Sequence, residues 1–349
     1  HEPGRQAPGE APGGFARDSP VAVYYGRPVR RVLERFPRLR YPIWVLETVP
    51  LLAFWGVAAS LSPVRASRLG RWLLERLGPR LHKQRHVLRN LGIALPGHSP
   101  EELARVAREV WGNLGAVMGE YPHLATISQV EGARRLELVF EQGASTPTAT
   151  RPIVMVTGHL ANWELVAGAM TGLLGIPLSV VYGPQENPLA DRLIQRFRRG
   201  LRCGLVAKEA SMRQLVRELR EGRSLGLVVD QRVDGSPLVP FFGVPAATAV
   251  SPARLALRFG CDLVPVRMER LPDARFRVTF TPPVPVPERG NDDEKALEMT
   301  RRVNALFESW IRERPGEWMC AKRRWSLREV RKAQAAQAPA AGQQRPVPP

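Results

Sequence analysis

Hydrophobic and polar positions along the chain alternate in a way that predicts short strands separated by helices. Apolar, β-branched runs read as strands at residues 153–157, 178–182, 225–229, 262–268 and 275–281. In the last run, Phe276, Val278 and Phe280 alternate strictly with other residues, as in a strand with one buried face. Strands that alternate with helices predict an α/β fold, with a central, mostly parallel or mixed sheet flanked by helices.

The predicted helices carry recognisable end signals. Ser99, Pro100 and Glu102 form a capping box with proline at the first helical position. Apolar residues within 211–221 share one helical face, and Gly222 ends that helix. A short helix opens at Ser251, and a long one runs from Asn291 to just before Pro315. These segments supply the crossovers that parallel strands need.

Residues 42–64 are the most hydrophobic window. The stretch from Thr48 to Val64 has no charge, but its 17 residues fall short of the roughly 20 that a spanning helix needs. If Glu47 lies near one interface, a tilted span or a deep interfacial helix becomes possible. The alternative is a buried helix of a soluble core, because Glu47 and Pro50 weaken the spanning interpretation. Basic residues on both sides predict no orientation.

The predicted domain organisation has four parts. Residues 1–41 form a flexible basic arm, and residues 331–349 form a disordered tail, because both are rich in Pro, Gly and polar residues. Residues 42–65 form a membrane-anchoring or interfacial helix. Residues 66–330 form the α/β domain.

Charge and cysteine content narrow the possible partners. The 51 Lys and Arg exceed the 33 Asp and Glu, and a net charge of +18 favours anionic lipid, nucleic acid or an acidic protein. The basic residues are dispersed, and no recognition helix or RNA-binding signature accompanies them, so we do not expect a nucleic-acid partner. The three cysteines have no spacing suited to zinc or to a disulfide framework. We therefore expect no metal, and a reducing compartment.

Candidate chemistry appears at a strand-to-helix junction, "IVMVTGHLANWELVAGAM" (residues 153–170). Within one continuous helix His159 and Glu164 would be about 140° apart. A strand ending at Thr157, a turn through Gly158 and a helix from near Asn162 would instead let His159 swing back toward Glu164. The carboxylate would then fix the imidazole tautomer and leave the other ring nitrogen as a general base.

This arrangement predicts a catalytic triad without its own nucleophile, since a substrate hydroxyl takes the place of the serine. His159 would be the base and Glu164 its orienting partner. The alternative is a structural His–Glu pair, which is the commoner reason for such a spacing.

A serine hydrolase is a competing hypothesis, because "GRSLG" (residues 222–226) matches G-x-S-x-G. A nucleophile elbow needs a strand before its serine and a helix after it. Here the predicted helix precedes Ser224 and the predicted strand follows, so Ser224 is rejected as a nucleophile. The chain also lacks the glycine-rich phosphate-cradling motifs.

Several stretches resemble one family in its own order. "GHLANWEL" resembles the H-x-x-x-x-D/E signature of glycerolipid-type acyltransferases, and more closely the bacterial lipid A biosynthesis acyltransferases that add lauroyl or myristoyl chains. The further similar stretches are "QRHVLRNLGIALPGHSPEEL", "VYGPQENPLADRLIQRFR", "LGLVVDQR", "VPFFGVPAATAVSPARLALRFGCDLVPV" and "RPGEWMCAKRRW". The similarity spans about residues 42–326.

The resemblance implies that His159 deprotonates the acceptor hydroxyl, which attacks the thioester of an acyl carrier protein or acyl-coenzyme A, while Glu164 orients His159. Asn162 and Trp163 would shape the turn or contact substrate, with capping and packing as the alternative. Asp230 would be a second polar site residue, with Gln231 and Arg232 beside it. Phe241 and Phe242 would line the acyl channel or lie in the core.

Two departures from the family pattern bear on the acceptor. Tyr182, Gly183 and Pro184 stand where the family usually has Tyr-Arg-Pro, so Arg192 or Lys208 would have to supply the missing basic group. Lys322 stands where a histidine is common.

The resemblance implies an enzyme of the bacterial inner membrane, with its active site facing the cytoplasm and no cofactor beyond the thioester co-substrate. The expected acceptor is a lipid A precursor. The alternatives are a phosphatidylinositol mannoside or lyso-phospholipid acceptor, or an inactive basic protein that binds membrane surfaces.

Overall fold

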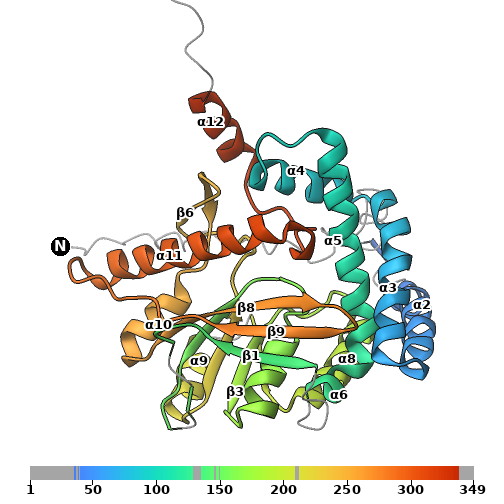
Figure 1. Cartoon of the computed structure of the whole chain (residues 1–349), viewed down its shortest axis with the longest axis horizontal. Coiled ribbons are helices and arrows are strands. Elements are labelled where there is room, and N and C mark those ends of the chain that lie inside the picture. The colour runs from blue at the N-terminus through green and yellow to red at the C-terminus, as the bar shows by residue number, and fades with distance from the viewer. Residues whose placement is uncertain are drawn as a thin grey trace, which may run out of the picture.

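The structure is a computed structural model that describes residues 35–36, 38, 40–128, 135–144, 147–148, 150–208 and 212–337. Nearly all of the predicted arm and residues 338–349 of the predicted tail lie outside these residues. Residues 331–337 of that tail belong to helix α12 (Leu327–Gln337), so the ordered domain extends beyond the predicted boundary at residue 330. Figure 1 shows α12 leaving the body of the molecule at the C-terminal end.

A seven-stranded sheet with the order β1-β9-β8-β2-β5-β3-β4 forms the centre (Figure 1). Its strands are β1 (Leu136–Phe140), β2 (Val154–Thr157), β3 (Leu178–Tyr182), β4 (Gly204–Ala207), β5 (Ser224–Val228), β8 (Leu263–Leu271) and β9 (Arg275–Phe280). From β8 to β4 all neighbours are parallel, whereas β9 pairs antiparallel with β8. β6 (Leu238–Phe241) and β7 (Val244–Ala247) form a separate antiparallel hairpin.

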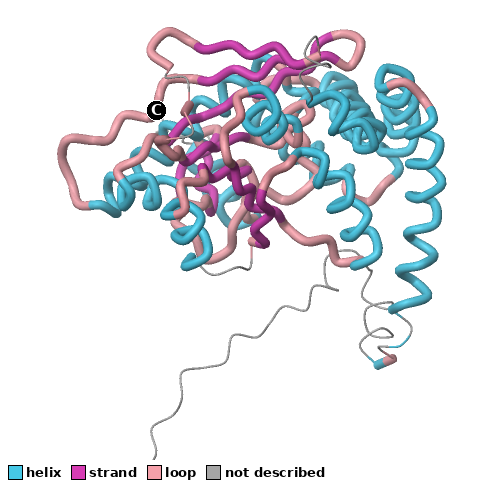
Figure 2. The backbone as a smooth tube through the Cα atoms, turned by 90° about the horizontal axis from the view of Figure 1, so that it is seen from below, coloured by secondary structure: helices cyan, strands magenta, loops and turns pink. Residues whose placement is uncertain are grey.

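Helices flank the sheet, and Figure 2 shows helical segments beside the central strands while other strands run along one edge of the molecule. In chain order they are α2 (Arg40–Ser60), α3 (Pro63–Leu77), α4 (Gln84–Ala94), α5 (Pro100–Glu120), α6 (Leu124–Ser128), α7 (Leu165–Gly168), α8 (Pro188–Arg198), α9 (Met212–Arg220), α10 (Ser251–Phe259) and α11 (Asp292–Glu313). Alternate residues of β2 enter two different hydrophobic clusters: Val154 packs with residues of α5, α9, α10 and α11, and Met155 with residues of α2, α6 and α7. The sheet is therefore buried on both faces, as parallel sheets generally are.

These elements confirm the predicted fold class. Each of the five predicted strands is present, and the capping box at Ser99 and Glu102 forms with both of its hydrogen bonds. The strands β1, β4, β6 and β7 were not predicted. Each has only four or five residues and lacks the long apolar run that marks a buried strand.

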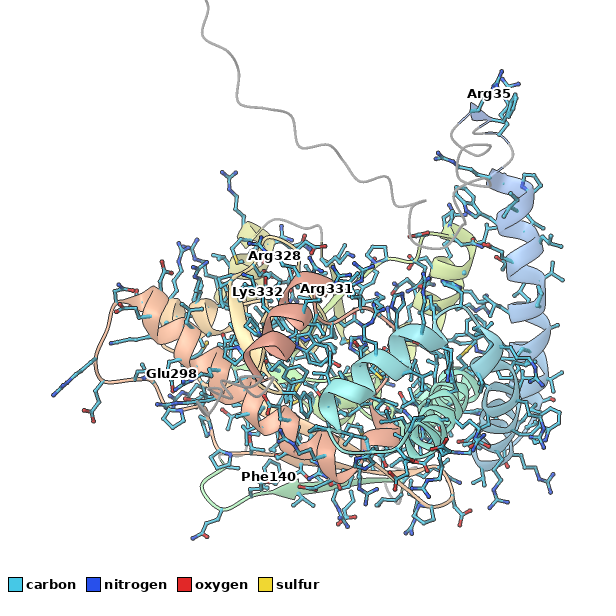
Figure 3. All side chains as sticks on the ribbon, turned by 90° about the horizontal axis from the view of Figure 1, so that it is seen from above. Arg35, Phe140, Glu298, Arg328, Arg331 and Lys332 are labelled. Carbon is cyan, nitrogen blue, oxygen red and sulfur yellow. The ribbon has the colours of Figure 1, made fainter. Side chains whose placement is uncertain are left out.

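Helix α2 stands at one edge of the molecule. Figure 3 shows it extending past the rest of the domain, with Arg35 near its outer end. Among the described residues it is the one helix long and apolar enough to cross a membrane. Only Thr48, Trp55 and Ala58 of α2 are buried, so it is not a core helix of the domain.

Close backbone contact holds α3 against α5. A Cβ atom added to Gly70 would lie 2.0 Å from the carbonyl oxygen of Gly115, and one added to Gly115 would lie 2.1 Å from that of Gly70. Since only glycine permits this approach, the two glycines fix the distance between the helices. Helix α5 in turn contributes Asn113 and Glu120 to the network beneath the candidate site.

Candidate active site

Two neighbouring strands end beside each other and place the principal polar side chains. β2 and β5 are parallel, with Thr157 opposite Val228, and the N–H of Val229 donates to the carbonyl of Thr157 at 3.0 Å. His159 follows β2 and Asp230 follows β5. Ligand sites of parallel sheets lie outside the carboxyl ends of the strands, and these two side chains meet there.

His159 and Asp230 form a tight pair. The Nδ1 atom of His159 lies 2.6 Å from Oδ1 of Asp230. The Asp230 side chain is buried, whereas that of His159 is 15% exposed and remains reachable from solvent. A carboxylate at this distance favours the proton on Nδ1, which leaves a lone pair on Nε2.

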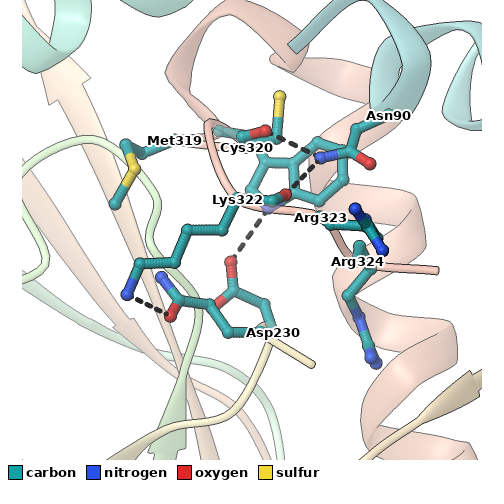
Figure 4. A pocket seen from close by; sticks show the side chains of 9 residues that line it. Asn90, Asp230, Met319, Cys320, Lys322, Arg323 and Arg324 are labelled. Carbon is teal, nitrogen blue, oxygen red and sulfur yellow. Dashed lines mark hydrogen bonds between the residues drawn. The ribbon is translucent and has the colours of Figure 1, made fainter. Parts of the chain in front are cut away.

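Trp318 fixes the other oxygen of the carboxylate. Its indole Nε1 donates to Oδ2 of Asp230 at 2.9 Å (Figure 4). Burial acts to raise the pKa of Asp230, but the charge and hydrogen bond of His159 and the hydrogen bond of Trp318 outweigh it, and the net effect is a lowered pKa. Asp230 is therefore a carboxylate at neutral pH.

Gln231 contacts the opposite edge of the imidazole. Its Nε2 lies 3.1 Å from Nε2 of His159. Its Oε1 accepts from Nζ of Lys322 at 3.2 Å, the contact drawn at Lys322 in Figure 4. Because Lys322 can only donate, the amide nitrogen of Gln231 faces the ring. His159 Nε2 thus accepts a hydrogen bond, in agreement with a proton on Nδ1.

The C-terminal segment clamps the turn that carries His159. The N–H of Met319 donates to the carbonyl of His159 at 2.9 Å, and that of Ala161 donates to the carbonyl of Glu317 at 3.0 Å. Asn113 of α5 donates to the carbonyls of both Ala161 and Glu317. These contacts hold Ala161 at a φ of 47°, a left-handed conformation that alanine rarely adopts.

Trp318 and Asn113 were not predicted as site residues. "PGEWMC" lies about 160 positions from His159, and over such a separation the spacing in the sequence does not indicate whether two segments are in contact. The only signal was the resemblance of the C-terminal stretch "RPGEWMCAKRRW" to the same family as the His159 motif.

The predicted pairing of Glu164 with His159 is wrong. Glu164 accepts from Nε and Nη2 of Arg198 at 2.9 and 2.5 Å and from Oη of Tyr121 at 2.8 Å. A buried carboxylate needs a cation and hydrogen bonds, and α8 supplies the cation. Burial, followed by the Glu164 charge, raises the pKa of Tyr121, so the phenol remains a donor. The histidine takes its carboxylate from β5 instead.

The two residues between His159 and Glu164 differ in role. Asn162 is fully buried, and its Nδ2 donates to Oε2 of Glu120 at 2.8 Å, in a network that also includes Arg270. It therefore shapes the turn and does not face a substrate. The indole of Trp163 lies edge-on to the imidazole of His159, with centroids 4.9 Å apart, so Trp163 borders the site.

Of the predicted basic residues, Lys208 is the one placed beside the altered Tyr-Gly-Pro segment. A Cβ atom at Gly183 would lie 3.6 Å from Cδ of Lys208. Arg192 is exposed on α8, and among the described residues no hydrogen bond or ion pair joins it to His159 or Asp230. Arg232 turns away to Asp234, with Nη2 2.6 Å from Oδ1.

Phe241 and Phe242 lie in an aromatic cluster with Trp318 and Trp325. Phe241 is fully buried and stacks on Trp325 with ring centroids 5.7 Å apart, and Phe242 is 9% exposed. Both rings belong to the core, so the structure does not support their predicted role as channel walls. Their packing fixes Trp318, and through it Asp230.

The position of Ser224 agrees with the prediction that it is not a nucleophile. It begins β5 directly after α9, is 1% exposed, and its Oγ accepts from the N–H of Ile153 at 3.1 Å. A hydroxyl used for sheet pairing has no access to a substrate.

The model of the family described as bacterial lipid A biosynthesis acyltransferase matches residues 35–326. The chain belongs to this family. Its members include a lipid A biosynthesis palmitoleoyltransferase of Escherichia coli K12, which is 25% identical over 300 residues, or 82% of this chain and 89% of the relative. A lipid A biosynthesis acyltransferase of Haemophilus influenzae is 22% identical over 287 residues, or 80% and 84% of the two chains.

A solved structure, the 1-acyl-sn-glycerophosphate acyltransferase PlsC of Thermotoga maritima, is similar with a TM-score of 0.34 and 12% identity, over 69% of this chain and 97% of that one. Family membership makes the chain an acyltransferase of lipid A biosynthesis that acts on a lipid acceptor.

Proposed function

We propose that the protein transfers a fatty acyl chain from a thioester to a hydroxyl of a lipid A precursor, with His159 as general base and Asp230 as its orienting carboxylate. The observation that carries this proposal is the 2.6 Å contact between Nδ1 of His159 and Oδ1 of Asp230. It leaves Nε2 as the atom that accepts a proton. Glu164 contributes indirectly, by anchoring the segment after His159 to α8 through Arg198.

The reaction follows from this tautomer. Nε2 of His159 takes the proton of the acceptor hydroxyl as its oxygen attacks the thioester carbonyl carbon. A C–O bond forms, the C–S bond then breaks, and the imidazolium returns its proton to the leaving thiolate. Asp230 stabilises the positive ring between these steps, as the aspartate of a catalytic triad does.

The acyl donor in this proposal is an acyl carrier protein or acyl-coenzyme A, and no further cofactor takes part. A net charge of +18 favours an acidic carrier protein and an anionic membrane. We place the enzyme at the bacterial inner membrane with its site on the cytoplasmic side.

Helix α2 is the proposed membrane contact. Asn187 of the segment before α8 donates to the carbonyl of Trp44 at 3.0 Å, and His123 lies 2.9 Å from the carbonyl of Ala58. Both halves of α2 are thus attached to the domain on one side. Its large exposed apolar residues are Tyr41, Val45, Leu46, Val49, Leu52 and Val57. Burying this face in lipid removes it from water while the opposite face keeps its protein contacts.

The proposed chemistry is tested with purified protein, acyl-carrier-protein or acyl-coenzyme A donors, and lipid A precursor. We expect His159→Ala to lower the rate by about 10²- to 10⁴-fold, whereas His98→Ala, at an exposed position, keeps it. Mass spectrometry of the product identifies the acylated lipid, and so separates a lipid A precursor from another acceptor. Full activity of His159→Ala would overturn the base assignment, whereas no acyl transfer by the wild-type protein would favour a non-catalytic protein that binds membrane surfaces.

The membrane contact is tested by sedimentation with vesicles that contain anionic phospholipid. Leu46→Glu combined with Val49→Glu should lower the bound fraction strongly, because each carboxylate is expensive to place in lipid. Val286→Glu makes the same change at another exposed apolar residue and serves as the matched control. Equal binding of both proteins would contradict the role of α2.

A further inference from the structure

Lysine is rare in this chain, and its placement is uneven. Only five of the 51 basic residues are lysines: Lys83, Lys208, Lys295, Lys322 and Lys332. Three of them, Lys83, Lys208 and Lys322, come from segments more than 100 positions apart, yet Lys83 and Lys208 lie close enough to Lys322 for their charges to act on it. We call these three the lysine cluster.

Lys322 ties the lysine cluster to the catalytic pair. Its Nζ donates to Gln231, whose amide nitrogen contacts His159. The backbone carbonyl of Lys322 accepts from Nδ2 of Asn90 at 2.7 Å. Asn90 lies on α4, and Lys83 is the N-cap residue of the same helix. One helix therefore positions two of the three lysines. Figure 4 shows the side chain of Lys322 on one side of its segment and those of Arg323 and Arg324 on the other.

Lys208 follows β4, which pairs with β3, and so lies beside the segment that follows β3. Its N–H donates to the carbonyl of Tyr182 at 2.8 Å, and its side chain runs past Gly183, with Nζ 3.9 Å from where a Cβ of Gly183 would lie. A larger residue at position 183 would share this space with the lysine. The altered Tyr-Gly-Pro segment and Lys208 thus fit together locally.

The cluster has a strongly positive local field. Lys322 is exposed at its surface, but partial desolvation and the charges of Lys208 and Lys83 lower the pKa of its ammonium group. Glu186, in the segment before α8, lies close enough to all three lysines for their charges to act on it. Desolvation and Glu47 raise the pKa of Glu186 and outweigh the three lysines, which act to lower it. A carboxylate therefore already lies where the lysines attract negative charge.

We propose that Lys83, Lys208 and Lys322 form a phosphate-binding subsite beside His159, and that Glu186 competes with the phosphate for it. Lysine supplies compact, mobile charges that suit a phosphate ester. The phosphate is carried either by the acceptor lipid or by the phosphopantetheine arm of the donor. This inference rests on the proposed function, since it deepens the account of the same site.

Substitutions of the lysines and of Glu186 are predicted to change KM in opposite directions. Lys83→Ala and Lys208→Ala should each raise the KM for the phosphate-bearing substrate about tenfold, with little change in kcat. Glu186→Gln should lower that KM, because it removes the competing carboxylate. A merely structural role for these residues would not produce changes in opposite directions.

Two comparisons identify the source of the phosphate. The acceptor lipid is used before and after enzymatic removal of its phosphates, and the donor is used as acyl-coenzyme A and as an acyl-pantetheine without phosphate. If the variants affect only the phosphorylated acceptor, the subsite binds the lipid headgroup. If they affect only acyl-coenzyme A, it binds the donor.

Pyrophosphate binding, measured by calorimetry on the full chain, does not depend on turnover. We expect the triple variant Lys83→Ala, Lys208→Ala, Lys322→Ala to lose this binding, whereas Lys295→Ala with Lys332→Ala keeps it. Pyrophosphate binding by a wild-type protein that acylates no lipid would retain the subsite and reject the proposed function. Equal pyrophosphate affinity of the two multiple variants would overturn the subsite.

Discussion

Replacing Asp230 by asparagine tests which carboxylate orients His159. The sequence suggested Glu164, whereas the structure places Asp230 beside the imidazole. The Asp230 carboxylate accepts from two N–H donors, Nδ1 of His159 at 2.6 Å and Nε1 of Trp318 at 2.9 Å. A carboxamide has only one oxygen. In Asp230→Asn one of these donors must therefore face an NH₂ group, or the imidazole must move its proton to Nε2 and cease to be a base.

The size of the effect follows from these contacts. A hydrogen bond to a charged group contributes about 1.5–3 kcal/mol, and an unpaired buried donor costs about 1–3 kcal/mol. Together they amount to about 2.5–6 kcal/mol of transition-state stabilisation, which corresponds to a loss of about 10²- to 10⁴-fold in kcat. The fold should survive, because the new side chain has nearly the same shape.

The assay measures kcat at saturating donor and acceptor for Asp230→Asn, Glu164→Gln and the wild type, with circular dichroism as the check on folding. Asp234→Asn provides a matched control, because Asp234 is four positions away with a side chain that is 81% exposed. The reasoning is refuted if Glu164→Gln lowers kcat more than Asp230→Asn does, or if Asp230→Asn turns over like the control.

Three further predictions concern stability. Glu164→Gln breaks the buried pair with Arg198 and should lower the free energy of unfolding by about 3 kcal/mol in urea titration; no loss would mean that the pair is not stabilising. Gly115→Ala should lower it by about 1–3 kcal/mol through the clash with the Gly70 backbone, whereas Gly56→Ala, which meets nothing within 4 Å, should not. The pKa of Asp230 is lowered on folding, so its stabilising contribution is present above the ordinary pKa of about 3.9 and is lost as pH falls through the folded value; thermal unfolding of Asp230→Asn should depend less on pH below about 4.

The sequence predicted the elements that have strong local signals. Continuous apolar runs located β2, β3, β5, β8 and β9, and the Ser99 capping box located the start of α5. The same reasoning rejected Ser224, because a helix precedes it and a strand follows. It missed α3 and α8, which start after Ser62 and Asn187 but whose apolar residues are interrupted by several arginines.

The partner of His159 could not be obtained from local spacing. The five-residue interval to Glu164 suggested a contact, but Ala161 adopts a left-handed turn and Glu164 comes after it, on the side facing α8. Asp230 was recognised as a site residue at the end of a predicted strand. What the sequence did not reveal is the strand order, which places β5 directly beside β2.

The base is therefore a product of tertiary structure. His159 and Asp230 are 71 positions apart, and Trp318, which fixes the carboxylate, lies a further 88 positions along the chain. Each of the three residues sits on a different segment, and the pairing of β2 with β5 and the clamp by residues 317–319 bring them together. A perturbation that loosens the C-terminal segment should thus weaken the base before it unfolds the sheet, because Trp318 and the turn contacts would be lost while the strand pairing remains. Such a change would lower kcat and leave the far-ultraviolet circular dichroism of the α/β core intact.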